Sequence, residues 1–119
     1  VIVAEYVEGP TLAEVLRASG PLSRETWLDV ARALASALAA AHAAQVIHRD
    51  VKTSNIVMGR DGLRLVDFGI AMSDGDGPDG RLTQAGQMSG TPLAIAPEQL
   101  EGAPASAASD QFAYGVVLY

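Results

Sequence analysis

Apolar residues recur at helical spacing through residues 23–44 and predict the longest helix of the chain. Ser23 is a suitable N-cap, and we expect the helix to run to about Ala44. The predicted apolar face consists of Trp27, Val30, Ala31, Leu34, Leu38 and Ala41. The many alanines on the rest of this helix favour helix formation and close packing, so we expect it to serve as scaffold.

Two further helices are indicated by capping residues. Thr11 is expected to cap a helix over residues 12–18, which Gly20-Pro21 would end. Near the other end of the chain, residues 106–109 predict a loop and a helix cap, and a third helix is expected to follow.

Short apolar runs predict β-strands. Val46-Ile47 and Ile56-Val57 are expected to form short buried strands on either side of a polar stretch. Residues 56–58 and 63–66 predict a hairpin, in whose turn an Asp-Gly pair supplies the positive φ. A further strand is expected at residues 1–4.

The polar stretch HRDVKTSN, residues 48–55, cannot be core, so the flanking strands are expected to present it as a rigid loop. A second acidic residue, Asp67, follows the next apolar strand. Loops from neighbouring strands would gather the side chains of Asp50, Lys52, Asn55 and Asp67. A carboxylate for the attacking hydroxyl, an ammonium group for the phosphoryl charge and hard oxygen ligands for Mg²⁺ together suit phosphoryl transfer.

These residues carry a resemblance to the protein kinase family, whose catalytic loop has the pattern H-R-D-x-K-x-x-N and whose metal site has the pattern D-F-G, here residues 67–69. The resemblance extends over residues 1–119 and implies part of a protein kinase domain with an α+β, protein kinase-like fold. It implies catalytic roles for Asp50, Lys52 and Asn55. The lysine at position 52 resembles Ser/Thr kinases rather than tyrosine kinases, and residues 67–71 and 96–99 resemble the eukaryotic-like Ser/Thr kinases of bacteria.

The resemblance also implies the cofactors ATP and Mg²⁺, with Mn²⁺ as a substitute for Mg²⁺. Asn55 and Asp67 would bind the metal ion. The residues expected to contact the nucleotide are Glu5, Val7, Lys52, Asn55, Val57 and Asp67. Among these, the backbones of Glu5 and Val7 would bind adenine, and Val57 would form the apolar floor beneath it.

Regulation and substrate docking are implied in the same way. Thr83 corresponds in placement to a phosphorylated threonine, and its phosphate would bind the Arg49 guanidinium. Gly90 and Thr91 would dock a protein substrate with a Ser or Thr acceptor. A second copy of the kinase is a further expected partner, for autophosphorylation. Without modification, Thr83 would be an ordinary loop residue and Arg49 a surface ion-pair partner.

Four other polar residues are expected to have structural roles. We interpret His42 as a packed or backbone-bonded histidine. By resemblance, His48 would pack beneath Phe68, and Asp110 would anchor the backbone of the 48–55 loop. Glu98 resembles a family glutamate whose arginine partner lies further along than residue 119, which would leave a buried carboxylate unpaired.

Composition narrows the class of protein. A hydrophobic content of 49% in 119 residues indicates one small globular domain. The net charge of −6 argues against nucleic acid or an anionic membrane as the main partner. The chain has no cysteine, which excludes disulfides and thiolate metal sites. No signal peptide is indicated at the start of the chain, and we expect a cytoplasmic location with no membrane contact within residues 1–119, a membrane anchor elsewhere in the parent protein being left open.

Three functions are compatible with this pattern, and a Ser/Thr protein kinase is favoured. The chain starts and stops within apolar runs, so we expect it to be an internal piece that is loosely packed and inactive without an ATP-binding lobe. The first alternative is a pseudokinase-like scaffold, against which the four polar residues argue. The second is a small-molecule phosphotransferase, which would not be expected to carry the docking segment that ends at residues 96–98.

Overall fold

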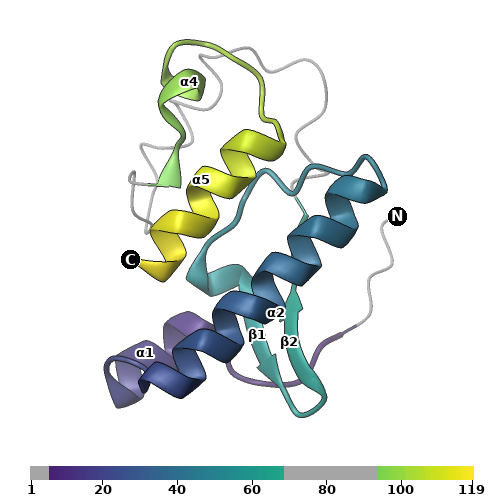
Figure 1. Cartoon of the computed structure of the whole chain (residues 1–119). Helices are drawn as coiled ribbons and strands as arrows, with labels where there is room; N and C mark the ends of the chain where they lie inside the picture. Colours follow the sequence, from purple (N-terminus) through teal and green to yellow (C-terminus); the bar gives the residue numbers. More distant parts are fainter. Residues whose placement is uncertain (1–5, 69–93) are drawn as a thin grey trace.

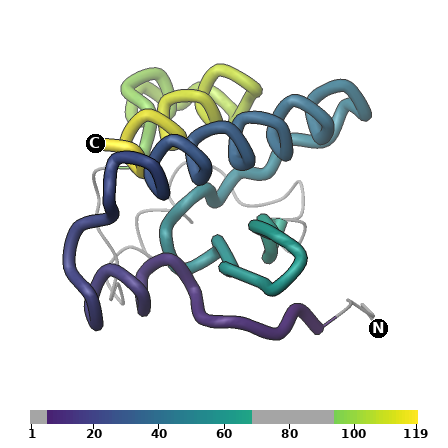
Figure 2. Tube along the Cα trace, turned by 60° about the horizontal axis from the view of Figure 1, so that its bottom comes forward, coloured from purple at the N-terminus to yellow at the C-terminus, as the bar shows by residue number. Residues whose placement is uncertain are grey.

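In the computed structural model, the long predicted helix packs against both the hairpin and the last helix. The structure describes residues 6–68 and 94–119. Its helices are α1 (Leu12–Ser19), α2 (Arg24–Ala43), α4 (Pro97–Leu100), α5 (Ala107–Leu118) and the short 3₁₀ turn η1 (Thr53–Asn55). Its strands are β1 (Ile56–Gly59) and β2 (Gly62–Leu65), which form an antiparallel hairpin. Helix α2 lies between α5 and the hairpin (Figures 1 and 2).

Helix α2 begins where the sequence predicts, because the Ser23 side chain accepts a hydrogen bond from the Thr26 backbone N–H. Its buried face packs on α1, the 48–55 loop, β1 and α5. The residues of this core are Leu12, Val30, Leu34, Leu38, Val51, Ile56 and Ala113. Trp27, predicted on the same face, is only partly covered, and its indole N–H donates to the Leu118 carbonyl at 3.0 Å.

The prediction of a strand at Val46-Ile47 is wrong, because Val46 takes part in ending α2. The Val46 N–H donates to the Ala41 carbonyl at 2.9 Å, and the Gln45 N–H donates to the His42 carbonyl at 3.0 Å. Gln45 has a left-handed φ of 61°. This pair of bonds is the Schellman arrangement that satisfies the last carbonyls of a helix. The chain therefore turns out of α2 directly into the 48–55 loop.

Helix α1 and the hairpin match their predictions closely. Thr11 and Glu14 form a reciprocal capping box at the start of α1, and Gly20 ends the helix. In the hairpin, Ile56 pairs with Leu65 and Gly59 with Gly62. The positive φ of the turn falls on Gly62, at 113°.

The segment before α1 lies along the free edge of β1. The Met58 N–H donates to the Pro10 carbonyl at 2.8 Å, and Thr11 bridges Val57. The approach requires glycine at position 9, where φ is 147° and a Cβ atom would lie 2.6 Å from the Met58 carbonyl oxygen. This contact covers the edge of the hairpin.

Helix α5 is fastened to α2 by polar as well as apolar contacts. Ser106 caps α5, and the Tyr114 hydroxyl donates to the Ala31 carbonyl at 3.0 Å. On the neighbouring α4, Glu98 is half-buried rather than buried as predicted, so water reaches part of its side chain. Of the described helices, none combines the length and the apolar character needed to cross a bilayer. The strand predicted at residues 1–4 lies outside the described residues.

Candidate active site

One buried carboxylate on α5 holds the backbone at the start of the 48–55 loop. The Asp110 side chain is 1% exposed. Its Oδ2 accepts the backbone N–H of His48 at 2.8 Å, and its Oδ1 accepts that of Arg49 at 2.9 Å. The predicted anchoring role of Asp110 is thus confirmed. Arg49 has a φ of 73°, a conformation that persists only where surrounding contacts enforce it.

His48 holds the loop from the inside. Its ring is fully buried, and its centroid lies 4.4 Å from that of Phe68 with the two ring planes tilted by 51°, which confirms the predicted packing of His48 against Phe68. Nδ1 accepts the Asp50 backbone N–H at 3.1 Å, and Nε2 donates to the Val66 carbonyl at 2.9 Å. Because a carbonyl can only accept, these two bonds together define the neutral Nε2–H tautomer.

The three predicted catalytic residues meet in the loop, with Asn55 buried and Asp50 and Lys52 half-exposed. The Asn55 amide nitrogen donates to the Asp50 carbonyl at 2.8 Å and to its carboxylate Oδ2 at 3.0 Å. Lys52 Nζ lies 3.2 Å from the same Oδ2. The side chains of Asp50 and Lys52 are both 47% exposed, so their ion pair adds little stability but keeps both groups within reach of a ligand.

The segment that carries Asp67 is clamped to this loop through its neighbours. The Val66 N–H donates to the Asn55 carbonyl at 2.9 Å, while the Val66 carbonyl accepts the His48 bond. Phe68, on the other side of Asp67, packs against the His48 ring. Asp67 itself is exposed and has a left-handed φ of 54°. The structure therefore brings the two predicted loops into direct backbone contact at Asn55.

The Asn55 amide and the Asp67 carboxylate are oxygen donors of the kind that suits a hard cation, with the remaining ligands of the cation supplied by a bound phosphate compound and water. Both bonds of Asn55 to Asp50 use the amide nitrogen, so the amide oxygen takes no part in them. Within residues 6–68 and 94–119, no cluster of three His, Cys, Asp or Glu side chains could hold a metal ion. One amide and one carboxylate are a typical protein share for Mg²⁺, which takes its other ligands from phosphates and water.

The remaining predicted site residues are less completely defined. Val57 is buried in β1, and Val7 is half-buried beside the same strand. Arg49 is exposed at the surface of the loop. Glu5, Thr83, Gly90 and Thr91 lie outside the described residues, so their predicted roles stay predictions.

One functional contact was missed from sequence. The His42 ring, predicted to be packed or backbone-bonded, instead places Nε2 at 2.9 Å from Asp110 Oδ2. The two residues are 68 positions apart, and no local pattern connects them.

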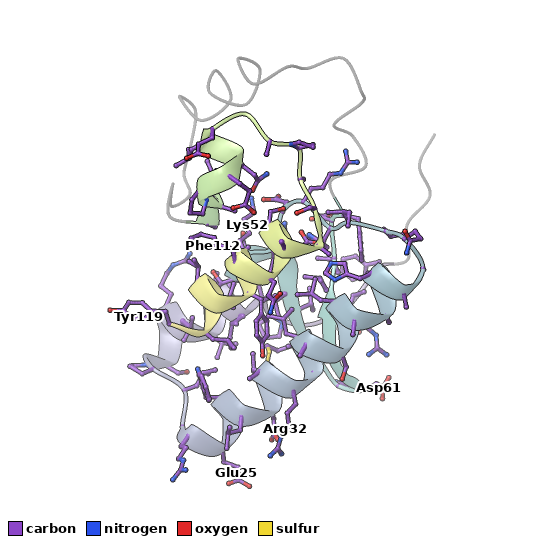
Figure 3. The ribbon with its side chains drawn as sticks, turned by 45° about the horizontal axis from the view of Figure 1, so that its top comes forward. Glu25, Arg32, Lys52, Asp61, Phe112 and Tyr119 are labelled. Atoms are coloured by element: carbon purple, nitrogen blue, oxygen red, sulfur yellow. The ribbon has the colours of Figure 1, made fainter. Side chains whose placement is uncertain are left out.

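In the described structure Lys52 lies away from the hairpin tip, where Asp61 is exposed (Figure 3).

Comparisons with known proteins place this arrangement in a family. A family model described as the protein kinase domain matches residues 1–119. Serine/threonine-protein kinase PknA of Mycobacterium tuberculosis is 44% identical over 119 residues, which is 99% of this chain and 27% of that protein. PrkC of Bacillus subtilis is 39% identical over 119 residues, covering 99% of this chain and 18% of PrkC.

The probable serine/threonine-protein kinase PkwA of Thermomonospora curvata is 40% identical over 113 residues, which is 95% of this chain and 15% of PkwA. The chain thus spans between 15% and 27% of the length of these relatives.

Proposed function

Because this chain belongs to the protein kinase family, we propose that it carries the catalytic loop of an ATP-dependent enzyme that phosphorylates Ser or Thr residues of proteins. The names of its relatives support the choice of Ser/Thr protein kinase. The chain corresponds to a minor part of those proteins, so the proposal concerns the full-length enzyme. By itself this chain is expected to be inactive, since ATP binding in the family needs a second lobe.

The observation that supports this proposal most strongly is the shared contact of Lys52 and Asn55 with one carboxylate oxygen of Asp50. Asn55 fixes the direction of the carboxylate, whose other surface stays open to solvent. A substrate hydroxyl placed there would donate its hydrogen bond to Asp50, which orients the attack and receives the proton. The Lys52 ammonium would stabilise negative charge on the transferred phosphoryl group.

The metal-binding role falls to Asn55 and Asp67. Mg²⁺, or Mn²⁺ in its place, neutralises the phosphate oxygens of ATP when bound. The backbone clamp at Val66 keeps the Asp67 segment against Asn55, so both side chains would be available on the same side of the site. Val57 and the backbones of Glu5 and Val7 are proposed to contact adenine, and Arg49 to bind a phosphate on Thr83.

The decisive experiment replaces Asp50 by Asn in the full-length enzyme. This change removes the proton acceptor with little change in shape, so we expect transfer of radiolabelled phosphate to a Ser/Thr peptide to fall roughly thousandfold. Binding of Mg-ATP should be largely preserved. Asp61→Asn is the matched control, because Asp61 is exposed at the hairpin tip and should leave the rate unchanged. Undiminished transfer by the Asp50→Asn enzyme would remove Asp50 from this role.

A further inference from the structure

We propose that Arg64 is a further nucleotide-binding residue and that its guanidinium group contacts the purine base of ATP. Arg64 lies in β2 directly opposite Val57 of β1. Side chains that are directly opposite on an antiparallel pair share one face of the sheet, with their Cβ atoms about 4.5–5.5 Å apart. Arg64 and Val57 therefore lie side by side on the same face of the hairpin. The inference rests on the proposed function, in which Val57 forms the floor beneath adenine.

The hairpin has one face in the core and one face turned away from it. The core face consists of Ile56, Met58, Leu63 and Leu65, which belong to the buried cluster or pack against it. Because successive side chains of a strand point to opposite faces, Val57 and Arg64 belong to the other face. Arg64 is exposed, so its charged group takes no part in the packing of the hairpin on α2.

The guanidinium group of Arg64 has hydrogen-bond donors to spare. Its hydrogen bond within the described residues is a long one, from Nη1 to the carbonyl of the adjacent Leu63 at 3.4 Å. It forms no ion pair with a carboxylate in residues 6–68 and 94–119. A guanidinium group carries five N–H donors and a flat face, so most of its binding capacity remains available to a ligand.

The position of Arg64 along the hairpin matches the base of a nucleotide and not its phosphates. The proposed metal ligands Asn55 and Asp67 lie at the end of the hairpin where the two loops meet. A strand advances about 3.3 Å per residue, so Arg64, level with Val57, lies roughly 7 Å along the strand from Asn55. Phosphates held at the metal ion would leave the purine base near Val57.

The chemistry of arginine suits a purine. The planar guanidinium group stacks on aromatic rings, and its charge is attracted to their electron-rich faces. Its N–H groups can also donate to a ring nitrogen such as N7 of adenine. The aliphatic part of the side chain can meanwhile lie against the neighbouring Val57, as the stems of long cationic side chains commonly do.

The test measures ligand binding to the full-length enzyme by isothermal titration calorimetry, so it does not depend on phosphate transfer. Arg64→Met keeps a long side chain and removes the guanidinium group. We expect this variant to bind Mg-ATP roughly fivefold more weakly, which corresponds to one exposed cation–π contact. It should bind adenosine more weakly by the same factor, because the lost contact is to the base.

Arg60→Met is the matched control, because Arg60 is an exposed arginine in the turn of the same hairpin. This variant should bind both ligands as tightly as the unmodified enzyme. Equal midpoints of urea denaturation for the two variants would show that the hairpin is intact in both. Arg64→Gln supplies the same comparison if the methionine variant does not fold.

Unchanged affinity of the Arg64→Met enzyme for adenosine, or an equal loss of affinity in Arg60→Met, would overturn the inference. A loss for Mg-ATP alone would assign the guanidinium group to the phosphates and would also overturn the contact to the base. If the unmodified enzyme binds neither ligand, the proposed function fails together with this inference. Normal binding by the unmodified enzyme and by Arg64→Met would contradict this inference alone.

Discussion

Two carboxylates in this molecule accept backbone N–H groups, yet they stabilise very different things. Glu14 Oε2 accepts the Thr11 N–H at 2.7 Å, across three positions of sequence, at the exposed start of α1. Asp110 accepts the N–H groups of His48 and Arg49 across 62 and 61 positions, and it is almost completely buried. The first contact defines the end of one helix. The second fixes the loop that carries Asp50.

The difference lies in what replaces the bond when it is lost. Water can reach the Thr11 N–H, so losing the Glu14 contact exchanges one hydrogen bond for another. Water is largely excluded around Asp110, so its partners would be left without an acceptor. A buried, long-range carboxylate should therefore matter more for stability and far more for the site than an exposed, local one.

The largest expected effect comes from Asp110→Ala. It removes the acceptor of two backbone N–H groups and of the His42 ring, and each unsatisfied buried donor costs roughly 1–3 kcal/mol. We expect the free energy of unfolding to fall by about 3 kcal/mol in urea denaturation. Asp61→Ala, at an exposed turn, is the control and should stay within about 0.5 kcal/mol. If Asp110→Ala lowers the free energy of unfolding no more than the control does, the buried carboxylate of Asp110 does not matter more for stability than the exposed one of Glu14.

Thr11→Ala should have a smaller effect. The Thr11 hydroxyl accepts the Glu14 backbone N–H at 3.2 Å, and loss of such an N-cap costs about 1 kcal/mol. Thr11→Ser keeps the hydroxyl and should remain close to the unmodified chain. Amide exchange should accelerate in the first turn of α1 but not at His48 or Arg49. Faster exchange at those two amides would mean that the cap and the 48–55 loop are coupled after all.

The smallest expected effect is a dependence on pH. Hydrogen bonds from the Thr11 backbone N–H, and then from its hydroxyl, lower the pKa of Glu14 below its ordinary value of 4.5. Because the folded pKa is the lower one, the contribution of Glu14 is complete above 4.5 and is lost as the pH falls through the folded pKa. An NMR titration of the Glu14 carboxyl carbon should show a midpoint below 4.5, and Thr11→Ala should move it upward. An unchanged midpoint in the Thr11→Ala chain would show that the Thr11 hydroxyl does not contribute to lowering the pKa of Glu14.

The helix starts and the hairpin turn could be predicted from residues close to them in the sequence. Thr11 and Ser23 cap their helices as predicted, and the hairpin turn has its positive φ at Gly62, because these effects act within a few residues. The strand predicted at Val46-Ile47 is wrong for the opposite reason. Two apolar residues are compatible with a strand, but they carry no information about whether the neighbouring helix end will use the Val46 N–H.

The site required more than local patterns. The positions of His48 against Phe68 and of Asp110 beneath the loop were expected from the family resemblance and are confirmed by the contacts. The partner of His42 was not anticipated, since it depends on how α2 and α5 pack. Which polar residues take part was thus predictable, whereas the bond that ties α2 to the site emerged only from the tertiary structure.

The clamp on Val66 has a consequence for how this site tolerates change in its surroundings. Both backbone groups of Val66 are bound by the 48–55 loop, and Phe68 packs against His48 of the same loop. The location of Asp67 therefore depends on residues upstream of the hairpin as well as on the strand that leads to it. A change in the length of the turn at residues 60–61 should accordingly leave Asp67 in place, since the bonds that hold Val66 do not involve that turn.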